Sequence, residues 1–421
     1  MKEELRQRIG GLSPEQRARF EAALRDRGLA DTAEGAPPVA ADAPARPELR
    51  PPRAARDPEP AAPTPSASEL AFSLFFFSGD GFSRENDKYG PLLEAAEWAD
   101  AQGFHAVWVP ERHFHGFGGL YPNPAVLAAA IAMRTRRIGI RAGSVVMPLH
   151  HPARVAEDWA MLDNLSGGRV GVSLASGWVP EDFVLAGAPF EARRTTLLEG
   201  LAAFRRLWRG ETVPFPPPGG GDAVAVRSFP RPLQPELPVW LTTSGSRETW
   251  IQAGRLGLNV LTGLLRGTLG EVAGHAAAYR EARREAGHDP ESGRVTLMIH
   301  TFVGRDEGYV RAQVREPLLG YIRTHMSLYE MQGLAGGGLP MDVSRLTPDD
   351  REAIAEIAFE RYLGENGLFG TVESCLPRLA RIRASGVDEI GCLVDFGLDR
   401  ATMTEGLGLL AELRDRNRGG D

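Results

Sequence analysis

A run of small polar residues in the middle of the chain could bind a phosphate. Thr243, Ser244, Gly245 and Ser246 come directly before Arg247, and a helical pattern follows them. Free backbone N–H groups, hydroxyls and the positive end of a helix dipole together form an anion site, and an arginine adds a charge-assisted contact. A simple helix cap by one of the two serines would use the same residue types, so the segment alone leaves both interpretations open.

A pair of histidines separated by one residue, His113 and His115, could begin a metal site. Barrel hydrolases use such a pair together with histidines from other strand ends and an aspartate from the last strand, where Asp395 lies. The fifth and sixth predicted strands end in Thr, Ser and Gly, and the loop residues His150 and His151 do not supply the missing ligands. A metal ion with too few ligands is not held, so we predict no metal site.

The elements that would position these residues begin at Glu69, where apolar strand-like runs start to alternate with helical patterns. The helical patterns include residues 92–102, 153–165 and 248–254. Eight near-continuous apolar strands alternating with helices favour a parallel sheet closed into an α/β barrel, the (β/α)8 TIM barrel. A doubly wound open sheet is the alternative, but no G-x-G-x-x-G motif follows the first strand. The predicted strands are Leu70–Phe77, His105–Val109, Ile138–Val146, Val170–Ala175, Val239–Thr242, Asn259–Leu261, Val295–Val303 and Glu389–Phe396.

In such a barrel the reactive groups lie at the carboxyl ends of the strands, so the polar residues above should meet at one face. Two of the gaps between predicted strands are long. Residues 209–237 are rich in Pro and Gly and predict a loop, whereas residues 304–370 predict a mostly helical insertion. Insertions in barrels usually cover the active face. We therefore expect 304–370 to cover the site, within a domain that spans 69–421.

The N-terminal 68 residues differ from this pattern. Residues 1–30 predict a short charged helical module, with Ser13 as the N-cap and Gln16 completing a capping box. Residues 31–68 contain 11 Ala and 10 Pro among 38 positions, which predicts a disordered Ala/Pro-rich linker. A helix this short is marginal alone, so it either packs on its own barrel or docks to another polypeptide. The long linker favours docking.

Composition sets further limits on function. The 421 residues carry a formal net charge of -7, which argues against a nucleic-acid surface because such a surface would be basic. The two cysteines, Cys375 and Cys392, exclude a disulfide framework and a multi-thiolate metal site. No apolar run approaches the roughly 20 residues that span a bilayer, and the charged N-terminus does not resemble a secretory signal. We expect a cytoplasmic enzyme that binds neither nucleic acid nor membrane.

The stretch between Pro110 and Phe183 contains P-E-R-H-F, Y-P-N-P, R-I-G-I-R-A-G-S-V-V-M-P-L-H-H-P and D-N-L-S-G-G-R-V. Three further motifs are S-L-F-F-F-S at Ser73–Ser78, L-A-S-G-W at Leu174–Trp178 and G-V-D-E-I-G-C-L-V-D-F-G at Gly386–Gly397. Together the motifs resemble the bacterial luciferase-like FMN-dependent monooxygenase family. The last three resemble the branch of that family associated with nonribosomal peptide and polyketide synthases. The resemblance covers about residues 70–400.

The resemblance implies a (β/α)8 barrel that binds reduced FMN and reacts it with O2. It also implies that His113 is the active-site histidine near the flavin. Gly143-Ser144 occupies the position where the family often has a non-prolyl cis peptide under the isoalloxazine. Ser176 and Ser244–Arg247 match the positions at which members of the family bind the phosphate of the flavin. The resemblance therefore favours phosphate binding over a simple helix cap at Ser244–Arg247. The predicted cofactor-binding residues are Ser78, Glu111, Gly143, Ser144, Ser176, Gly177, Thr243, Ser244, Gly245, Ser246 and Arg247.

We therefore predict an FMNH2- and O2-dependent monooxygenase that oxidises an acyl or aminoacyl intermediate tethered to a carrier protein in nonribosomal peptide or polyketide biosynthesis. Its expected partners are that carrier protein and a flavin reductase that supplies FMNH2. Because the family is often dimeric, a homodimer is a further expectation. Hydroxylation, N-oxidation and oxygen insertion into a C–C bond all stay open.

Two alternatives and one departure accompany this prediction. The same barrel could use the deazaflavin F420 for hydride transfer, or the chain could be a flavin-binding docking subunit without catalysis, against which His113 argues. Many relatives carry a His-x-Asn set after G-W, where this chain has Val179, Pro180 and Glu181. Substrate handling after the fourth strand is therefore expected to differ from theirs.

Overall fold

The computed structural model describes the barrel region of the chain and one isolated N-terminal residue. The described residues are 13, 69–80, 87–217, 219–264, 267–331 and 346–419. The predicted helical module and linker, at 1–30 and 31–68, lie outside this set apart from Ser13. Among the helices of the described part, none is both long enough and apolar enough to cross a membrane.

Eight parallel strands form a closed barrel, as predicted. They are hydrogen-bonded in the order β9-β11-β1-β2-β3-β4-β7-β8, and a further pairing between β8 and β9 closes the ring. All eight predicted strands are confirmed, with ends that differ by a few residues. Their bounds are β1 (Ala71–Phe75), β2 (Ala106–Val109), β3 (Gly139–Val146), β4 (Val170–Ala175), β7 (Val239–Thr242), β8 (Asn259–Gly263), β9 (Val295–Val303) and β11 (Glu389–Leu393).

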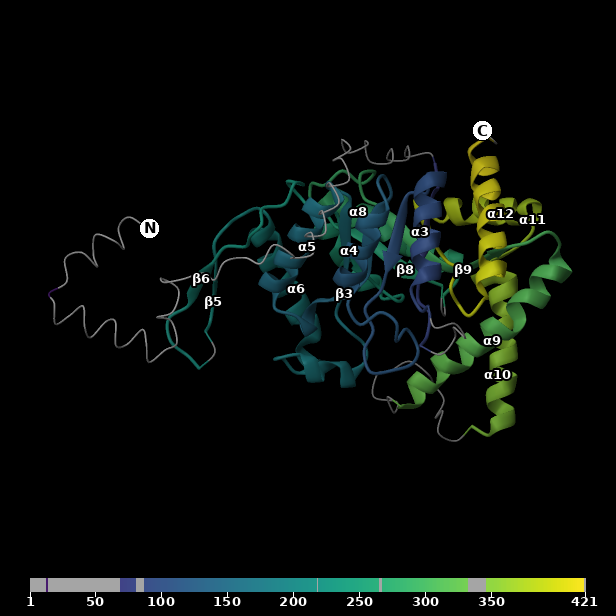
Figure 1. Cartoon of the computed structure of the whole chain (residues 1–421), viewed down its shortest axis with the longest axis horizontal. Coiled ribbons are helices and arrows are strands. Elements are labelled where there is room, and N and C mark those ends of the chain that lie inside the picture. Colours follow the sequence, from purple (N-terminus) through teal and green to yellow (C-terminus); the bar gives the residue numbers. More distant parts are fainter. Residues whose placement is uncertain are drawn as a thin grey trace, which may run out of the picture. The chain divides into compact units, whose positions relative to one another are not determined.

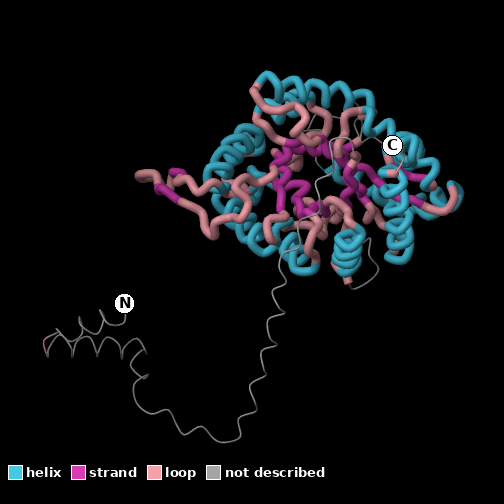
Figure 2. The backbone as a smooth tube through the Cα atoms, turned by 90° about the horizontal axis from the view of Figure 1, so that it is seen from above, coloured by secondary structure: helices cyan, strands magenta, loops and turns pink. Residues whose placement is uncertain are grey.

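Helices surround the ring of strands, which Figure 2 shows from above. Strands such as β2 are buried along their whole length because one face packs on helices and the other fills the barrel. This is why they are apolar at successive positions rather than alternate ones. The surrounding helices are α3 (Gly90–Gln102), α4 (Pro124–Arg134), α5 (Pro152–Ser166), α6 (Arg193–Trp208), α7 (Arg247–Arg255), α8 (Leu269–Glu285), α11 (Val372–Ala384) and α12 (Arg400–Arg418). Short 3-10 turns are η1 (Met147–Leu149), η2 (Pro180–Leu185) and η3 (Phe190–Ala192).

The segment 209–237, predicted as a loop, contains a small antiparallel hairpin. Its strands are β5 (Val213–Phe215) and β6 (Val224–Val226), labelled at the left of Figure 1. Two runs of three mostly apolar residues flank a Pro/Gly-rich turn. Runs this short give no recognisable strand pattern in a segment that is rich in Pro and Gly. The prediction of an entirely irregular loop was therefore wrong at these residues.

In its described residues, 304–331 and 346–370, the insertion after β9 is largely helical, as predicted. It comprises α9 (Glu307–Met331), α10 (Pro348–Arg361), the π-helical turn η5 (Tyr362–Asn366) and a three-residue strand β10 (Leu368–Gly370). β10 pairs in parallel with β9 outside the ring and was not predicted, because three residues give too short a pattern. The apolar side of α9 packs against the barrel interior, where Leu318 and Tyr321 share a core with Phe75 and Trp108.

Candidate active site

The predicted site residues come from five neighbouring strands. They follow β1, β2, β4 and β7, and Gly143-Ser144 lies inside β3. These strands are parallel and adjacent in the order β1-β2-β3-β4-β7, so their carboxyl ends share one face and one side of the barrel. The closed topology therefore brings residues that are far apart in sequence to one end of the fold.

A buried carboxylate, Glu111, organises the ends of β2 and β3. Its Oε1 accepts hydrogen bonds from Nε2 of His113 at 2.9 Å and from Nε2 of His150 at 2.6 Å. Its Oε2 accepts one from the N–H of Val146 at 2.7 Å. Burial alone would raise the pKa of Glu111, but these hydrogen bonds hold it below its ordinary value. The carboxylate therefore stays ionised and orients both imidazoles.

His150 was not predicted as a site residue. The sequence placed His150 in a loop. Its position shortly after the end of β3 was the feature that could have indicated a role in the site. The 3-10 turn η1 redirects the chain after β3 so that His150 faces Glu111. Burial lowers the pKa of His150, but the bond to Glu111 outweighs burial and the pKa is raised above its usual value.

A buried ion pair spans the ends of β2 and β4. Nη1 of Arg112 lies 2.8 and 3.1 Å from the two carboxylate oxygens of Asp182, and the side chains are 3% and 10% exposed. The guanidinium also lies 5.7 Å from the ring centre of Trp178. Asp182 lies in η2, directly after the segment Val179–Glu181 that departs from the family pattern. The carboxylate that neutralises Arg112 therefore lies directly beside the segment that departs from the family pattern. Neither Arg112 nor Asp182 was predicted as a site residue.

The middle of β3 approaches other barrel residues closely. The peptide bond between Gly143 and Ser144 is cis, as the resemblance implied. A Cβ atom on Gly143 would lie 2.8 Å from Cζ of Phe75 and 3.0 Å from Cε3 of Trp108, so glycine is required for this packing. The hydroxyl of Ser144 lies 2.5 Å from Oγ1 of Thr242 on β7. These contacts fix the inner wall beneath the open end of the barrel.

The predicted phosphate segment between β7 and α7 is accessible. Residues 244–248 are exposed, and Ser246 is the N-cap of α7 without a side-chain capping hydrogen bond. Gly245 has φ 121°, a conformation that favours glycine, although a Cβ atom at this position would meet no other atom within 4 Å. The alternative of a simple side-chain cap by Ser246 is therefore not what the structure contains. On the neighbouring strand end, Ser176 and Gly177 follow β4 and are half-buried.

A second carboxylate, Asp395, ties the end of β1 to the segment after β2. Its oxygens accept hydrogen bonds from the N–H groups of Phe77 at 2.7 Å and Ser78 at 2.9 Å, and from the hydroxyl of Tyr121 at 2.6 Å. Burial raises the pKa of Asp395 to about 6, although these donors oppose the rise. Asp395 thereby fixes the backbone at Ser78, a predicted cofactor contact. In the sequence, Asp395 had been considered only as a possible metal ligand.

Aromatic side chains line the side of the interior that faces the insertion. His300 of β9 lies between Tyr321 at 4.6 Å and Tyr362 at 4.8 Å between ring centres, and burial lowers its pKa to about 3. Phe117 contacts Tyr321 and His325 at 4.9 and 5.0 Å. This wall was missed because its members come from β9, α9 and η5, which no local pattern connects. A neutral, aromatic wall favours apolar or flat groups.

The two histidines of the pair, His113 and His115, have different hydrogen-bond partners. Nδ1 of His115 accepts a hydrogen bond from the N–H of Phe117 at 3.0 Å, whereas His113 bonds to Glu111. Across the residues that the structure describes, no three His, Cys, Asp or Glu side chains are grouped as metal ligands.

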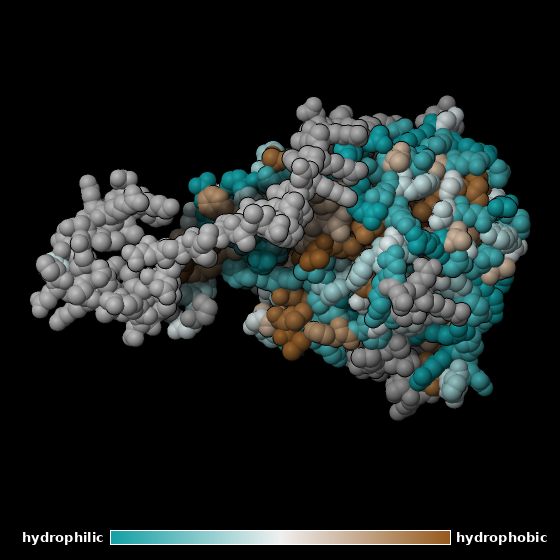
Figure 3. Space-filling model, in the orientation of Figure 1, coloured by the Kyte–Doolittle hydropathy of each residue, from teal (hydrophilic) through white to brown (hydrophobic). Residues whose placement is uncertain are grey.

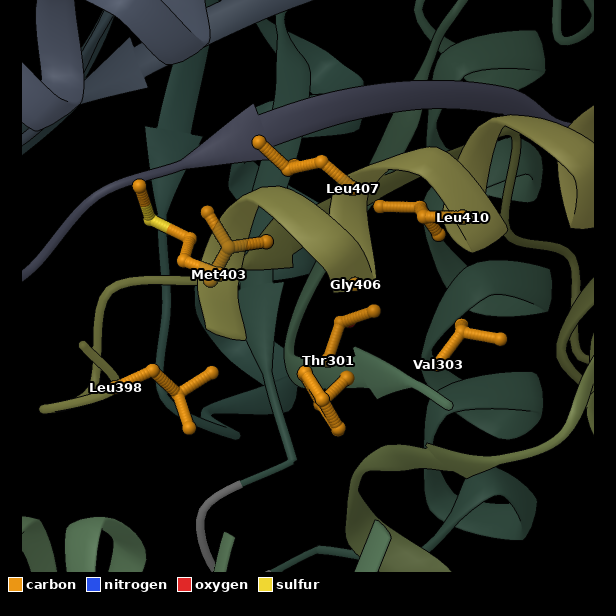
Figure 4. Close-up of a pocket in the computed structure, with 9 residues that line it drawn as sticks. Thr301, Val303, Leu398, Met403, Gly406, Leu407 and Leu410 are labelled. Atoms are coloured by element: carbon orange, nitrogen blue, oxygen red, sulfur yellow. The ribbon is translucent and has the colours of Figure 1, made fainter. Parts of the chain in front are cut away.

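One internal cavity, drawn in Figure 4, is a packing defect. It lies between β9 and α12, near Thr301, Met403 and Leu407, and its volume is about 10 Å³. A space of this size holds at most one water molecule, and apolar side chains surround it. It is too small for any cofactor.

The model of the family described as luciferase-like monooxygenase matches residues 69–389. Among characterised relatives, the chain is similar to the oxygenase component of flavin-dependent trigonelline monooxygenase from Acinetobacter baylyi. The two sequences are 27% identical over 345 residues, which cover 78% of this chain and 90% of the relative.

Solved structures show the same barrel. Monooxygenase RslO1 from Streptomyces bottropensis superposes with a TM-score of 0.67 at 26% identity, covering 82% of this chain and 98% of that one. The FMN complex of the oxygenating constituent of 3,6-diketocamphane monooxygenase from Pseudomonas putida gives 0.65 at 18% identity, covering 83% and 98%. An F420-dependent secondary alcohol dehydrogenase gives 0.63 at 19% identity, covering 83% and 99%. The last two likenesses, below 25% identity, show the shared fold.

Proposed function

Because this chain belongs to the luciferase-like monooxygenase family of flavin-dependent oxidoreductases, we propose that it uses reduced FMN and O2 to oxidise an acyl or aminoacyl group tethered to a carrier protein. The observation that carries the proposal is the pairing of two features at one end of the barrel. One is the uncapped start of α7 with its exposed hydroxyls, and the other is the ionised Glu111 bonded to His113.

The start of α7 suits the phosphate of FMN. The hydroxyls of Ser244 and Ser246 are exposed, and Arg247 adds a positive charge beside the positive end of the helix dipole. Ser176 and Thr243 stand at the ends of the two adjacent strands β4 and β7. These residues would hold the phosphate, while the interior beside Gly143-Ser144 would take the flat ring system.

The other end of the site handles protons. Bound reduced FMN supplies two electrons and the means to activate O2. His113, held by Glu111 and 10% exposed, can donate or accept a proton next to the ring system while excluding bulk water. The buried pair of Arg112 and Asp182 adds a fixed wall without adding net charge.

The carrier-bound substrate is supported by the motifs shared with the synthase-associated branch and by apolar residues near the open end. Figure 3 shows a largely hydrophilic surface interrupted by hydrophobic patches. Phe114 after β2 and Trp178 and Val184 after β4 are 62%, 43% and 78% exposed. Exposed apolar groups around a site entrance are typical of a surface that meets a partner. A flavin reductase is the second proposed partner, because the trigonelline relative is named as an oxygenase component.

The proposal is tested by incubating the protein with reduced FMN, O2 and carrier proteins loaded with candidate acyl or aminoacyl groups. We expect substrate-dependent O2 uptake and a mass increase of one oxygen atom on the carrier arm, whose fragmentation locates the oxidised atom. Reduced F420 in place of FMNH2 is the parallel arm, since an F420-dependent enzyme shares this fold. Turnover with F420 and none with FMNH2 would overturn the choice of cofactor.

We also propose that residues 1–30, on the linker 31–68, recruit the carrier or its synthase. Deleting residues 1–68 should leave FMN binding intact and slow turnover on the carrier-bound substrate. A small soluble mimic of the same acyl group is the control, because its turnover should not depend on recruitment. Equal turnover of the carrier-bound substrate by both proteins would contradict recruitment.

A further inference from the structure

Glu111 connects two histidines that differ in their access to water. Both Nε2 atoms lie within hydrogen-bond distance of the same oxygen, at 2.9 Å for His113 and 2.6 Å for His150. The side chain of Glu111 is fully buried, that of His113 is 10% exposed, and that of His150 is 33% exposed. The three groups therefore form a chain that begins at the surface and ends at the predicted active-site histidine.

We propose that His150 is a relay residue, which carries protons between solvent and His113 through the carboxylate of Glu111. The inference rests on the proposed function in one respect, which is the position of His113 beside the bound flavin. An oxygenation that consumes or releases protons in a closed site needs such a path, because the site excludes water. His150 itself need not touch flavin or substrate.

The proposed transfer conserves charge at each stage. His150 takes up a proton from solvent on its exposed side and becomes an imidazolium. Its Nε2 proton then passes to Oε1 of Glu111, which leaves a neutral imidazole and a neutral carboxylic acid. To receive this proton, His113 first takes the tautomer that carries its hydrogen on Nδ1, which leaves Nε2 free to accept. The acid then passes the proton to Nε2 of His113, and Glu111 returns to the carboxylate, which again accepts a hydrogen bond from Nε2. One proton enters and one imidazolium forms at His113, and reversal of the same steps removes a proton.

The surrounding charges permit this transfer. Asp158 of α5 lies near His150 and favours its charged form, although Asp158 is itself paired with Arg154 at 3.0 Å. On the other side, Asp182 is near His113 but is neutralised by Arg112 at 2.8 Å. The pKa of His150 is raised by its bond to Glu111 and that of Glu111 is lowered, so the contacts favour a charged outer histidine beside an ionised carboxylate.

A purely structural role for the same contacts makes a different prediction. If Glu111 only holds the two imidazoles in place, any side chain that donates a hydrogen bond at position 150 should serve equally well. His150→Gln separates the two roles, since the amide N–H can still reach Glu111 but cannot carry an extra proton near neutral pH. The neighbouring His151, which caps α5 and makes no contact with Glu111, gives the matched control His151→Gln.

The first test uses the flavin-free full chain and does not depend on turnover. The imidazole resonances of His113 and His150 are followed by NMR as a function of pH. Coupled groups titrate in steps that belong to the pair, so the resonance of His113 should respond to the ionisation of His150. His150→Gln should remove that step, and His151→Gln should leave it. A titration curve of His113 that is identical in the wild-type protein and in His150→Gln would overturn the relay.

The second test measures oxidation with reduced FMN. We expect His150→Gln to slow turnover by about tenfold, less than the about 10²–10⁴-fold that a direct acid–base group contributes. The loss should grow with rising pH, where solvent protons are scarce.

In His150→Gly, added imidazole should restore turnover, which a structural role does not predict. An unchanged pH profile in His150→Gln, or a loss in His150→Gly that imidazole does not relieve, counts against the relay. If the wild-type protein shows no flavin-dependent oxidation, the proposed function fails, whereas the NMR titration still decides whether the histidines are coupled.

Discussion

Among the described residues of the barrel, two glutamates are buried, one at each end, and they have different kinds of partner. Glu389, at the amino end of β11, accepts from Nη1 of Arg141 at 2.6 and 2.8 Å. It also accepts from Ser73 Oγ at 2.6 Å and from Trp108 Nε1 at 2.9 Å. Glu111, at the carboxyl end of β2, accepts from two histidines and a backbone N–H instead.

The difference lies in whether the partner can lose its charge. Arginine stays protonated at every physiological pH, and its guanidinium is further held over Trp240 at 4.5 Å. Despite full burial, Arg141 lowers the pKa of Glu389 to about 2. Histidine changes its charge near neutral pH, so the Glu111 cluster can respond to its surroundings. We infer that the amino end of the interior is a fixed structural layer and the carboxyl end a titratable one.

The largest expected effect comes from breaking the structural layer. Glu389→Gln would leave the Arg141 guanidinium buried without a compensating charge, which costs about 3–5 kcal/mol. Urea unfolding at pH 7 should show a loss of this size in the free energy of unfolding. Glu97→Gln is the control, because its pair with Arg134 is 39% and 44% exposed and such pairs contribute about 0–1 kcal/mol. Equal losses in the two variants would contradict a special role for Glu389.

A smaller effect, with the opposite dependence on pH, should come from Asp395 at the carboxyl end. Its pKa is raised to about 6, so between pH 4 and 6 the folded chain keeps a proton that the unfolded chain has released. The wild-type protein should therefore lose stability as pH rises through this window. Asp395→Asn should gain about 1–2 kcal/mol relative to the wild-type protein from pH 4 to 6, which allows for partial exposure.

Unfolding of both proteins at a series of pH values checks this sign. The relative stability of Glu389→Gln should change in the other direction, because the contribution of a carboxylate with a depressed pKa is present above the unfolded value and is lost on acidification. Asp222→Asn, at an exposed loop position, controls for the introduction of an amide. A constant difference between Asp395→Asn and the wild-type protein would show that Asp395 does not titrate in this window.

The sequence predicted the strands well because burial on both faces makes each one a continuous apolar run. The helix start after Ser244–Ser246 was also predicted from local sequence, because the small polar residues and the helical pattern are adjacent in the chain. Local sequence patterns could not predict the contacts of either glutamate, Glu111 or Glu389. Arg141 is 248 residues from Glu389, and the available signal was its charge inside a mostly apolar strand.

The carboxyl end was harder to predict for a second reason. Whether His150 or Asp182 reaches the site depends on the 3-10 turns η1 and η2, each of which is too short to leave a periodic pattern. The sequence could identify which strand ends carry polar residues, but turn geometry decides which of those side chains meet. The arrangement of side chains at this end of the barrel therefore depends on the least predictable part of the fold.

The smallest predicted effect concerns His150, which belongs to the titratable layer at the carboxyl end of the barrel. The pKa of His150 is raised by its bond to Glu111, against the effect of burial. A raised histidine pKa adds stability that is complete below the unfolded pKa, about 6.5, and is lost as pH rises through the folded value. The wild-type protein should therefore exceed His150→Gln in stability by about 1 kcal/mol in mild acid, the difference between a hydrogen bond from a charged imidazolium and the hydrogen bond that the neutral amide can still make. The difference should shrink as pH rises beyond neutrality, and urea unfolding at pH 6 and pH 9 measures it. A difference that is independent of pH would mean that His150 contributes only packing, and the two ends of the barrel would then be structural alike.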